Sequence, residues 1–195
     1  MLNGSNGRAV ARSLGQDDPT IGILNITGAS QTLRALQALK EGGYNLKFGE
    51  SQRADGGAIL RGNDILNPTV DICLCDSLTG NVLMKLFSAW QTGGAYEAAG
   101  WGYGPSAGAG WKQAVSIISR ASGAPVVAGA LTNTAAAVRG NLAAKVAEET
   151  AAAEKAGLRK ILENLTPAAP KAAEESKAPP AKPTGAEIAG VDVLD

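Results

Sequence analysis

Histidine is absent from this 195-residue chain, and no other feature of its composition excludes as much chemistry. Without histidine the chain has no Ser-His or Cys-His catalytic pair of its own, and a zinc site would lack its commonest nitrogen ligand. Cys73 and Cys75 are the only cysteines. They are two positions apart in a predicted strand, where disulfide geometry is rare. We therefore expect a site that uses neither a metal nor a cofactor.

Net charge and long apolar runs are lacking as well. Eighteen basic residues balance eighteen acidic ones, so no overall field favours nucleic acid, and an anion site has to be local. No run approaches the roughly 20 apolar residues of a membrane span, and the first residues lack the apolar core of a signal peptide. We expect a cytoplasmic protein with no nucleic-acid partner and no membrane span.

Alternating apolar strands and helices predict the fold class. Residues 20–26 and 69–75 form aliphatic runs typical of buried strands, a short strand is expected in 45–51, and a third apolar strand at 114–119. Helices are predicted after these strands, the first capped by Ser30. The alternation predicts an α/β fold with three layers, in which helices flank a largely parallel sheet.

The last predicted helix carries one apolar stripe, formed by Leu131, Val138, Leu142 and Val146. After Leu165 the composition changes to proline, alanine, lysine and glutamate. We therefore expect one domain over residues 1–165 and a disordered tail with a short terminal segment over 166–195. Residues 52–67 mix glycines with charges and indicate an irregular excursion or a hairpin.

Polar turns follow two of the predicted strands, at 76–81 and 119–123. Both turns would lie at the carboxyl edge of the sheet, where folds of this class bind ligands. In the first turn a helix begins with free backbone N–H groups, and its dipole favours an anion such as phosphate. The turn contains Ser77, Thr79, Gly80 and Asn81. A plain helix cap formed by Ser77 or Thr79 explains the same pattern, so both interpretations stay open.

Other polar residues are candidates for the same edge. Asn25 ends the first strand, and Asn3, Gly4 and Ser5 lie near the start of the chain, although ordinary turn residues look the same. Arg120, together with Ser119 and Ser122, is a candidate second anion contact, because a guanidinium binds phosphate oxygens in pairs. Lys85 is interpreted as a solvated charge.

The two cysteines lie within an apolar strand, where a thiol is usually an inert small hydrophobe. We expect Cys73 to be a core residue. Cys75 is nearest to the polar turn and is the candidate reactive thiol, although its activation would need the helix dipole or a base from a partner.

Three segments resemble the second half of the PlsX-type phosphate acyltransferases, which make acyl phosphate from an acyl thioester and inorganic phosphate. These segments are "PTIGILNI", "VDICLCDSLTGNVLMK" and "SIISRASG". The resemblance covers residues 7–141, and its most specific element is the motif Asp76, Thr79, Gly80 and Asn81. It implies a fold like that of phosphotransacetylases and isocitrate dehydrogenases.

Departures from those strings point to a narrower family. Ser77, Leu78 and the insertion "QRADGGAILR", with "TGGAYEAAGWGYGP" and the terminal "AGVDVL", resemble the α subunits of component C of glycine/sarcosine/betaine reductases. That family implies transfer of an acetyl group from a thioester to phosphate in amino-acid fermentation. Its chains are about twice this length, so the sequence resembles a carboxyl-terminal half, which need not be active alone.

The resemblance also implies roles and partners. Asn81 would act in catalysis and Cys75 would be the candidate acyl carrier, while the phosphate or substrate would contact Asn25, Ser77, Thr79, Gly80, Asn81, Arg120 and Ser122. The implied partners are the component C β subunit, the selenoprotein component, an acyl thioester and phosphate, with a homo-oligomer as a further option. Two alternatives stay open: a PlsX-type enzyme of phospholipid synthesis that uses an acyl carrier protein, and a non-catalytic assembly module.

Overall fold

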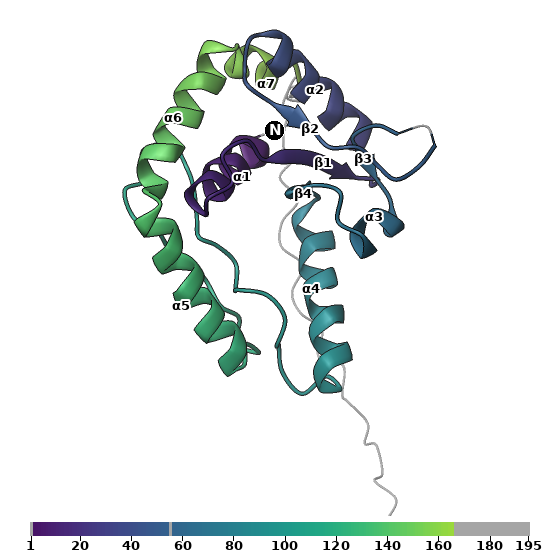
Figure 1. Cartoon of the computed structure of the whole chain (residues 1–195), viewed down its shortest axis with the longest axis vertical. Helices are drawn as coiled ribbons and strands as arrows, with labels where there is room; N and C mark the ends of the chain where they lie inside the picture. Colours follow the sequence, from purple (N-terminus) through teal and green to yellow (C-terminus); the bar gives the residue numbers. More distant parts are fainter. Residues whose placement is uncertain (1, 55, 166–195) are drawn as a thin grey trace, which may run out of the picture. The chain divides into compact units, whose positions relative to one another are not determined.

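The computed structural model describes residues 2–54 and 56–165 (Figure 1). These residues fall in one compact unit, Met1–Leu165. The predicted tail, 166–195, lies outside the described residues. No helix in the described ranges is long and apolar enough to cross a membrane.

A parallel sheet of four strands is organised around β1 (Thr20–Leu24). On one side β1 pairs with β4 (Ile72–Leu74), and on the other it pairs with β2 (Lys47–Phe48) and β3 (Ile59–Leu60). Every pairing is parallel. Because β2 and β3 are only two residues long, each covers a different half of β1. The prediction of a largely parallel sheet with flanking helices is confirmed.

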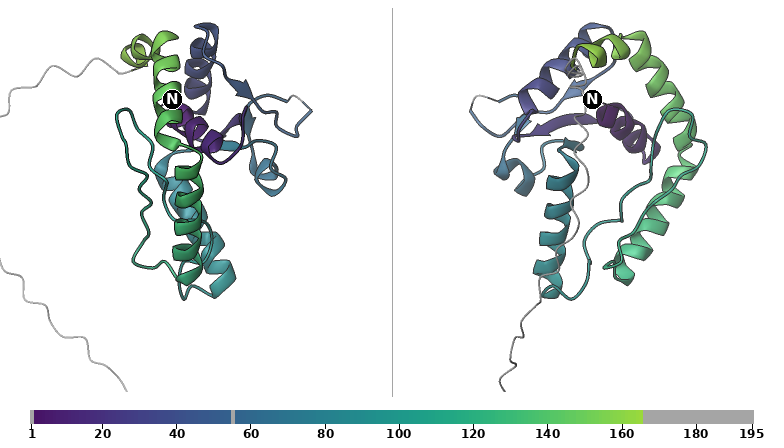
Figure 2. Two further views of the ribbon diagram at one scale, coloured as in Figure 1. Left: turned by 60° about the vertical axis from the view of Figure 1, so that its left-hand side comes forward. Right: turned by 180° about the vertical axis from the view of Figure 1, so that it is seen from behind.

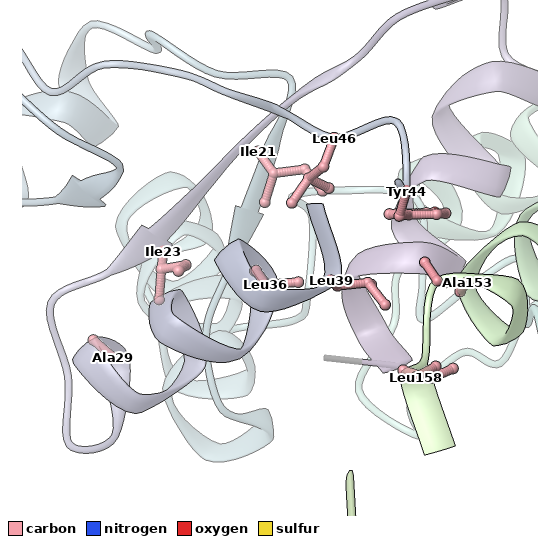
Figure 3. Close-up of a cluster of buried hydrophobic side chains, with 10 residues drawn as sticks. Ile21, Ile23, Ala29, Leu36, Leu39, Tyr44, Leu46, Ala153 and Leu158 are labelled. Atoms are coloured by element: carbon pink, nitrogen blue, oxygen red, sulfur yellow. The ribbon is translucent and has the colours of Figure 1, made fainter. Parts of the chain in front are cut away.

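Seven helices accompany the sheet in the described residues: α1 (Leu2–Ser13), α2 (Ala29–Glu41), α3 (Gly62–Leu66), α4 (Ser77–Thr92), α5 (Ala124–Arg139), α6 (Leu142–Lys155) and α7 (Leu158–Leu165). The main core forms where α2 packs on the sheet and meets the end of α6 and the start of α7. Ile21 and Ile23 of β1 lie in one buried cluster with Leu36 and Leu39 of α2 and with Leu158 (Figure 3). This packing fixes the start of α2 beside the end of β1.

Helix α1 was not predicted, because two glycines and few large apolar residues give its sequence a low helix propensity. Close packing of α1 against β4 stabilises the helix in place of intrinsic helix propensity. A Cβ atom added at Gly7 would lie 3.2 Å from the side chain of Ile72, and one at Gly4 would lie 3.6 Å from Leu74. Residues 3–5 are therefore the first turn of a helix that packs on β4.

A buried ion cluster joins α1 to α6. Arg8 is 3% exposed, and its Nε lies 3.3 Å from Glu149 Oε2, while an Arg12 nitrogen lies 2.8 Å from Glu149 Oε1. The Tyr44 hydroxyl also donates to Glu149. Burial, together with this hydrogen bond, raises the pKa of Tyr44. The cluster holds α1, and with it the amino end of the chain, in a fixed position.

One strand prediction was wrong, and another segment was predicted only in part. Residues 52–54 and 56–58 lie outside any helix or strand, as the irregular excursion implies, whereas β3 and the short helix α3 in the rest of 52–67 were not predicted. The predicted third strand at 114–119 is not a strand, since in that segment only Ile117 pairs, in an isolated antiparallel bridge with Tyr103. Neighbouring strands decide whether an apolar run becomes a strand, and residues 114–119 do not reach the sheet.

The stripe predicted on the last helix is divided between two helices. Leu131 and Val138 on α5 are exposed, whereas Leu142 and Val146 on α6 are buried. The chain turns between them at Asn141, whose φ is 58°, just after Gly140, where an added Cβ atom would lie 1.7 Å from the carbonyl oxygen of Ser13. Only glycine permits this approach to α1.

Candidate functional site

A cavity of about 190 Å³ lies at the carboxyl ends of β1 and β4. The first residues of α1, α2 and α4 meet around it. This is the edge of a parallel sheet at which ligands are expected to bind. The residues that line the cavity are Asn3, Ile23, Ile26, Thr27, Gly28, Ala29, Thr32, Leu74, Cys75 and Asp76. Asn3, one of the polar residues that the sequence left open as a candidate for this edge, lines the cavity.

The amino end of α4 is capped by Asp76, and not by Ser77 or Thr79. The Thr79 N–H donates to Asp76 Oδ1 at 2.9 Å, and the Thr79 hydroxyl donates to Oδ2 at 2.5 Å. These two hydrogen bonds lower the pKa of Asp76. An ionised carboxylate therefore lies where the phosphate was predicted, and both the N–H and the hydroxyl of Thr79 are hydrogen-bonded to it. Ser77 and Asn81 are exposed and Gly80 is half-buried.

Cys75 is half-buried at the cavity wall. Burial raises the pKa of its thiol, the negative charge of Asp76 raises it further, and a hydrogen bond from the Gly80 N–H opposes both effects. The thiolate is the nucleophilic form of cysteine. The surroundings therefore favour the unreactive, protonated thiol at neutral pH.

Cys73 is exposed, so the expectation that it is a core residue was wrong. Among the described strands β4 pairs with β1 alone, which leaves one edge of β4 uncovered. A short strand at the edge of a sheet does not bury its side chains on both faces, although its sequence is as apolar as that of a central strand.

We expect both thiols to react slowly with iodoacetamide, because partial burial of the Cys73 side chain raises the pKa of its thiol although the residue as a whole is exposed, and Cys75 adds a smaller contribution. At pH 7.5 each cysteine of the folded chain should be alkylated more slowly than in the urea-unfolded chain. Mass spectrometry of timed samples measures both rates. Faster alkylation of Cys75 in the folded chain would show an activated thiol instead.

The amino end of α2 borders the same cavity and has no side-chain cap. Its N-cap residue is Gly28, with φ of 86°, and the predicted cap, Ser30, does not cap the helix. The N–H groups of Ser30 and Gln31 make no hydrogen bond to any described residue. Unbonded N–H groups at a helix start favour an anion. The "TGAS" turn was visible in the sequence, but nothing in it distinguished an uncapped helix from a capped one.

Asn25 lies outside this cavity. Its N–H donates to the Leu60 carbonyl at 2.9 Å, which continues the pairing of β1 with β3. Its side chain lines a second cavity of about 300 Å³, together with Arg53, Arg61 and Leu33. The structure does not bring Asn25 together with the other predicted site residues.

Arg120 and Ser122 also lie away from the first cavity, since no residue of 119–122 lines it. The hydroxyl groups of Ser119 and Ser122 donate to Glu97 Oε2, at 2.7 Å and 3.0 Å. Arg120 is exposed on this turn. The predicted second anion contact is therefore separated from the predicted first one.

Glu97 is the main polar residue that the sequence did not reveal. It is 3% exposed, and it also accepts a hydrogen bond from the Tyr103 hydroxyl at 2.7 Å and forms an ion pair with Lys85 at 2.9 Å. Burial alone would raise its pKa, but the hydrogen bonds from Ser119, Lys85 and Tyr103 outweigh burial and lower it to about 2. The interpretation of Lys85 as a solvated charge was wrong.

Comparisons with known proteins agree with the resemblance. The chain is 47% identical, over 99% of its length, to the glycine/sarcosine/betaine reductase complex component C subunit alpha of Peptoclostridium acidaminophilum, and it spans 51% of that relative. It is also similar, over 40% of its length, to phosphate acyltransferases of Paraburkholderia phytofirmans (35% identical, 20% of the relative) and Brucella suis (31% identical, 22% of the relative). No family model and no solved structure gives a significant match. The predicted resemblance is confirmed, and the chain spans about half the length of its reductase relative.

Proposed function

We propose that this chain, as a relative of the component C α subunits, takes part in transferring an acetyl group from a thioester to inorganic phosphate. The product would be acetyl phosphate. One observation carries the proposal: Asp76, the first residue of the acyltransferase-like motif, lines a cavity at the carboxyl ends of two parallel strands, beside the uncapped start of α2. The more distant phosphate acyltransferases support the reaction class, and the name of the reductase relative supports a place in a reductase complex.

The reaction requires little from the protein beyond binding and orientation. A phosphate oxygen attacks the thioester carbonyl carbon, a C–O bond forms, the C–S bond breaks, and the sulfur leaves as a thiolate. Because phosphate is itself the nucleophile, no histidine base is required. Holding phosphate beside the thioester and donating hydrogen bonds to the developing oxyanion supply the rate enhancement.

We assign the phosphate to the α2 side of the cavity. The N–H groups of Ser30 and Gln31 are unbonded there, whereas at the start of α4 the carboxylate of Asp76, which lines the same cavity, already accepts the Thr79 N–H. Asp76 and Thr79 then fix the α4 turn, and Asn81 remains the proposed catalytic amide. An acyl-carrying role for Cys75 stays a prediction, one that its raised pKa disfavours.

The partners that would complete the activity are also part of the proposal. The chain spans about half of its reductase relative, so the other half, a component C β subunit and a selenoprotein component would complete the activity in the cytoplasm. Arg120 and Ser122 remain predicted phosphate contacts. Because they lie outside the first cavity, they would bind phosphate only at a second site.

Phosphate titration followed by NMR tests the assignment on this chain. Inorganic phosphate should shift the amide signals of Ser30 and Gln31. Ser30→Pro, which removes one donor at a position where a first helical turn tolerates proline, should weaken binding about tenfold or more, as expected for loss of a hydrogen bond to a charged group. The matched variant Ser77→Pro, at the start of α4, should leave phosphate binding unchanged.

Other outcomes would favour other functions. If Ser77→Pro loses phosphate binding and Ser30→Pro does not, the phosphate site would have to be assigned to the α4 turn instead. No amide shift with phosphate at either helix would favour the assembly module. In a protein that joins this chain to the remaining half of its relative, a preference for palmitoyl over acetyl thioesters would favour the PlsX-type enzyme of phospholipid synthesis.

A further inference from the structure

The second cavity lies at the carboxyl end of β1, on the side where β1 pairs with β3 rather than with β4. Its volume is about 300 Å³, and Arg53 and Arg61 line it together with Asn25. A further cavity of about 490 Å³ is lined by the same two arginines. Both views of Figure 2 show the connection between β2 and β3 at the side of the unit remote from α6. The reaction proposed above makes no use of this part of the molecule.

A buried carboxylate holds the segment that carries both arginines. Asp64 is 4% exposed. It accepts hydrogen bonds from the Gln52 N–H at 2.7 Å, the Arg61 N–H at 2.7 Å and the Ser51 hydroxyl at 2.8 Å. The two ends of the segment 52–61 are therefore attached to one side chain, which fixes the backbone at both arginines beside the cavity.

The described lining has a net positive charge. The hydrogen bonds from the N–H groups of Arg61 and Gln52 lower the pKa of Asp64, so its carboxylate is ionised at neutral pH. Asp64 is the only described acid that lines either of these two cavities, and its oxygens are already bonded to neutral donors. Among the described residues the Arg61 guanidinium has no hydrogen-bond or ion-pair partner. Two guanidinium charges are thus balanced by one carboxylate, whereas the first cavity is lined by Asp76.

This lining indicates the charged part of a ligand. A guanidinium presents parallel N–H donors that match the oxygens of a phosphate group in pairs. A phosphate monoester carries about 1.5 to 2 negative charges at neutral pH, which suits two arginines better than the single charge of a carboxylate does. The Asn25 side chain adds a neutral polar group to the same wall.

The size of the second cavity and its apolar wall indicate that the ligand also has an organic part. Leu33 of α2 and Ile59 of β3 line the cavity, and aliphatic side chains contact the organic part of a ligand rather than its phosphate. Pockets for organic molecules commonly have volumes of about 300 to 1,000 Å³, with a few polar groups on a largely apolar lining. The second cavity is therefore suited to a small phosphorylated molecule rather than to the phosphate ion alone.

We propose that Arg53 and Arg61 bind the phosphate group of a small phosphate monoester, whose organic part lies against the apolar wall of the second cavity. Neither Ser30 nor Gln31 lines this cavity, so the site is separate from the one assigned to inorganic phosphate at α2. Both arginines belong to the insertion at 52–61, and chains without this insertion would lack the site. The site goes beyond the proposed reaction and does not depend on it.

An NMR titration of the full chain with phenyl phosphate tests the site, because this probe joins a phosphate group to a small apolar ring. It should shift the amide signals of Gly57 and Arg61. Arg61→Gln and Arg53→Gln, each on an exposed side chain, should weaken binding about tenfold or more, as expected for lost hydrogen bonds between charged groups. The matched control is Arg34→Gln on α2, an exposed arginine that lines neither cavity, and it should leave the affinity unchanged.

Inorganic phosphate and the Ser30→Pro variant separate this site from the one at α2. Inorganic phosphate should shift the Gly57 and Arg61 amides only at higher concentration than phenyl phosphate does, and Ser30→Pro should not change the binding of phenyl phosphate read at Gly57. The site is overturned if phenyl phosphate shifts neither amide, or if Arg34→Gln weakens binding as much as Arg61→Gln, which would show a general effect of charge. Equal affinity for the two probes at Gly57 would overturn the ester as the ligand. Absence of shifts at Ser30 and Gln31 would count against the proposed function alone.

Discussion

Replacing Glu149 by alanine is expected to lower the free energy of unfolding by about 3 kcal/mol, because it removes the buried counter-charge of the Arg8 guanidinium and leaves only the half-exposed Asp18, at 3.7 Å. Arg8 is 3% exposed and cannot turn to solvent without moving α1. Arg12 and Tyr44 would lose a partner as well. A loss of this size is a large part of the stability of an ordinary domain. Urea unfolding followed by circular dichroism measures it.

Glu148→Ala is the matched control, since Glu148 is the neighbouring acid and pairs with Arg12 from an exposed position. Exposed ion pairs contribute about 1 kcal/mol or less. If Glu149→Ala does not fold, Glu149→Gln, which keeps the shape and part of the hydrogen bonding, takes its place. Equal effects at positions 148 and 149 would contradict the view that the buried cluster holds α1 on α6.

Replacing Glu97 by glutamine is expected to loosen the segment 93–123 and to cost about 2 to 3 kcal/mol, the range for lost hydrogen bonds to a charged group. The backbone of Glu97 pairs with Ala121 and Gly123, and its side chain connects this segment with Lys85 of α4. Without the carboxylate the hydroxyls of Ser119 and Ser122 lose their charged acceptor. Faster hydrogen exchange of the Gly123 amide, measured by NMR, checks the loosening.

The same carboxylate gives a pH signature. The folded pKa of Glu97 is lowered to about 2, below its value in an unfolded chain, so its contribution to stability is complete above pH 4.5 and is lost as the pH falls toward 2. The difference in unfolding free energy between wild type and Glu97→Gln should therefore shrink over that range. Glu50→Gln, on an exposed residue, is the control. A constant difference across this range would contradict the lowered pKa.

The parts of the fold that depend on nearby residues were predictable. β1 and α2 followed from an aliphatic run and a three-residue leucine spacing, and the α4 turn followed from its Thr-Gly-Asn sequence. The need for glycine at position 140 depends instead on Ser13, a contact between residues far apart in the chain. Similarly, the apolar run at 114–119 looked like a strand because the sequence does not show whether a neighbouring strand is within reach.

The candidate site was predictable in position but not in detail. The sequence located it after β4, because the carboxyl ends of parallel strands meet at one edge. It could not show that Asp76 would occupy the α4 cap or that Gly28 would leave α2 uncapped, since both depend on backbone angles. No sequence pattern indicated the role of Glu97, because its partners Lys85 and Ser119 come from two other segments.

The central place of β1 has a consequence for how the sheet assembles. β2, β3 and β4 all pair with β1, and no described strand pairs with another except through it. Removing the chain up to Leu24 would thus eliminate every strand pairing at once, whereas removing β2 would eliminate one. During synthesis β1 is made before the three described strands that pair with it, so these three strands add to a template that is already complete.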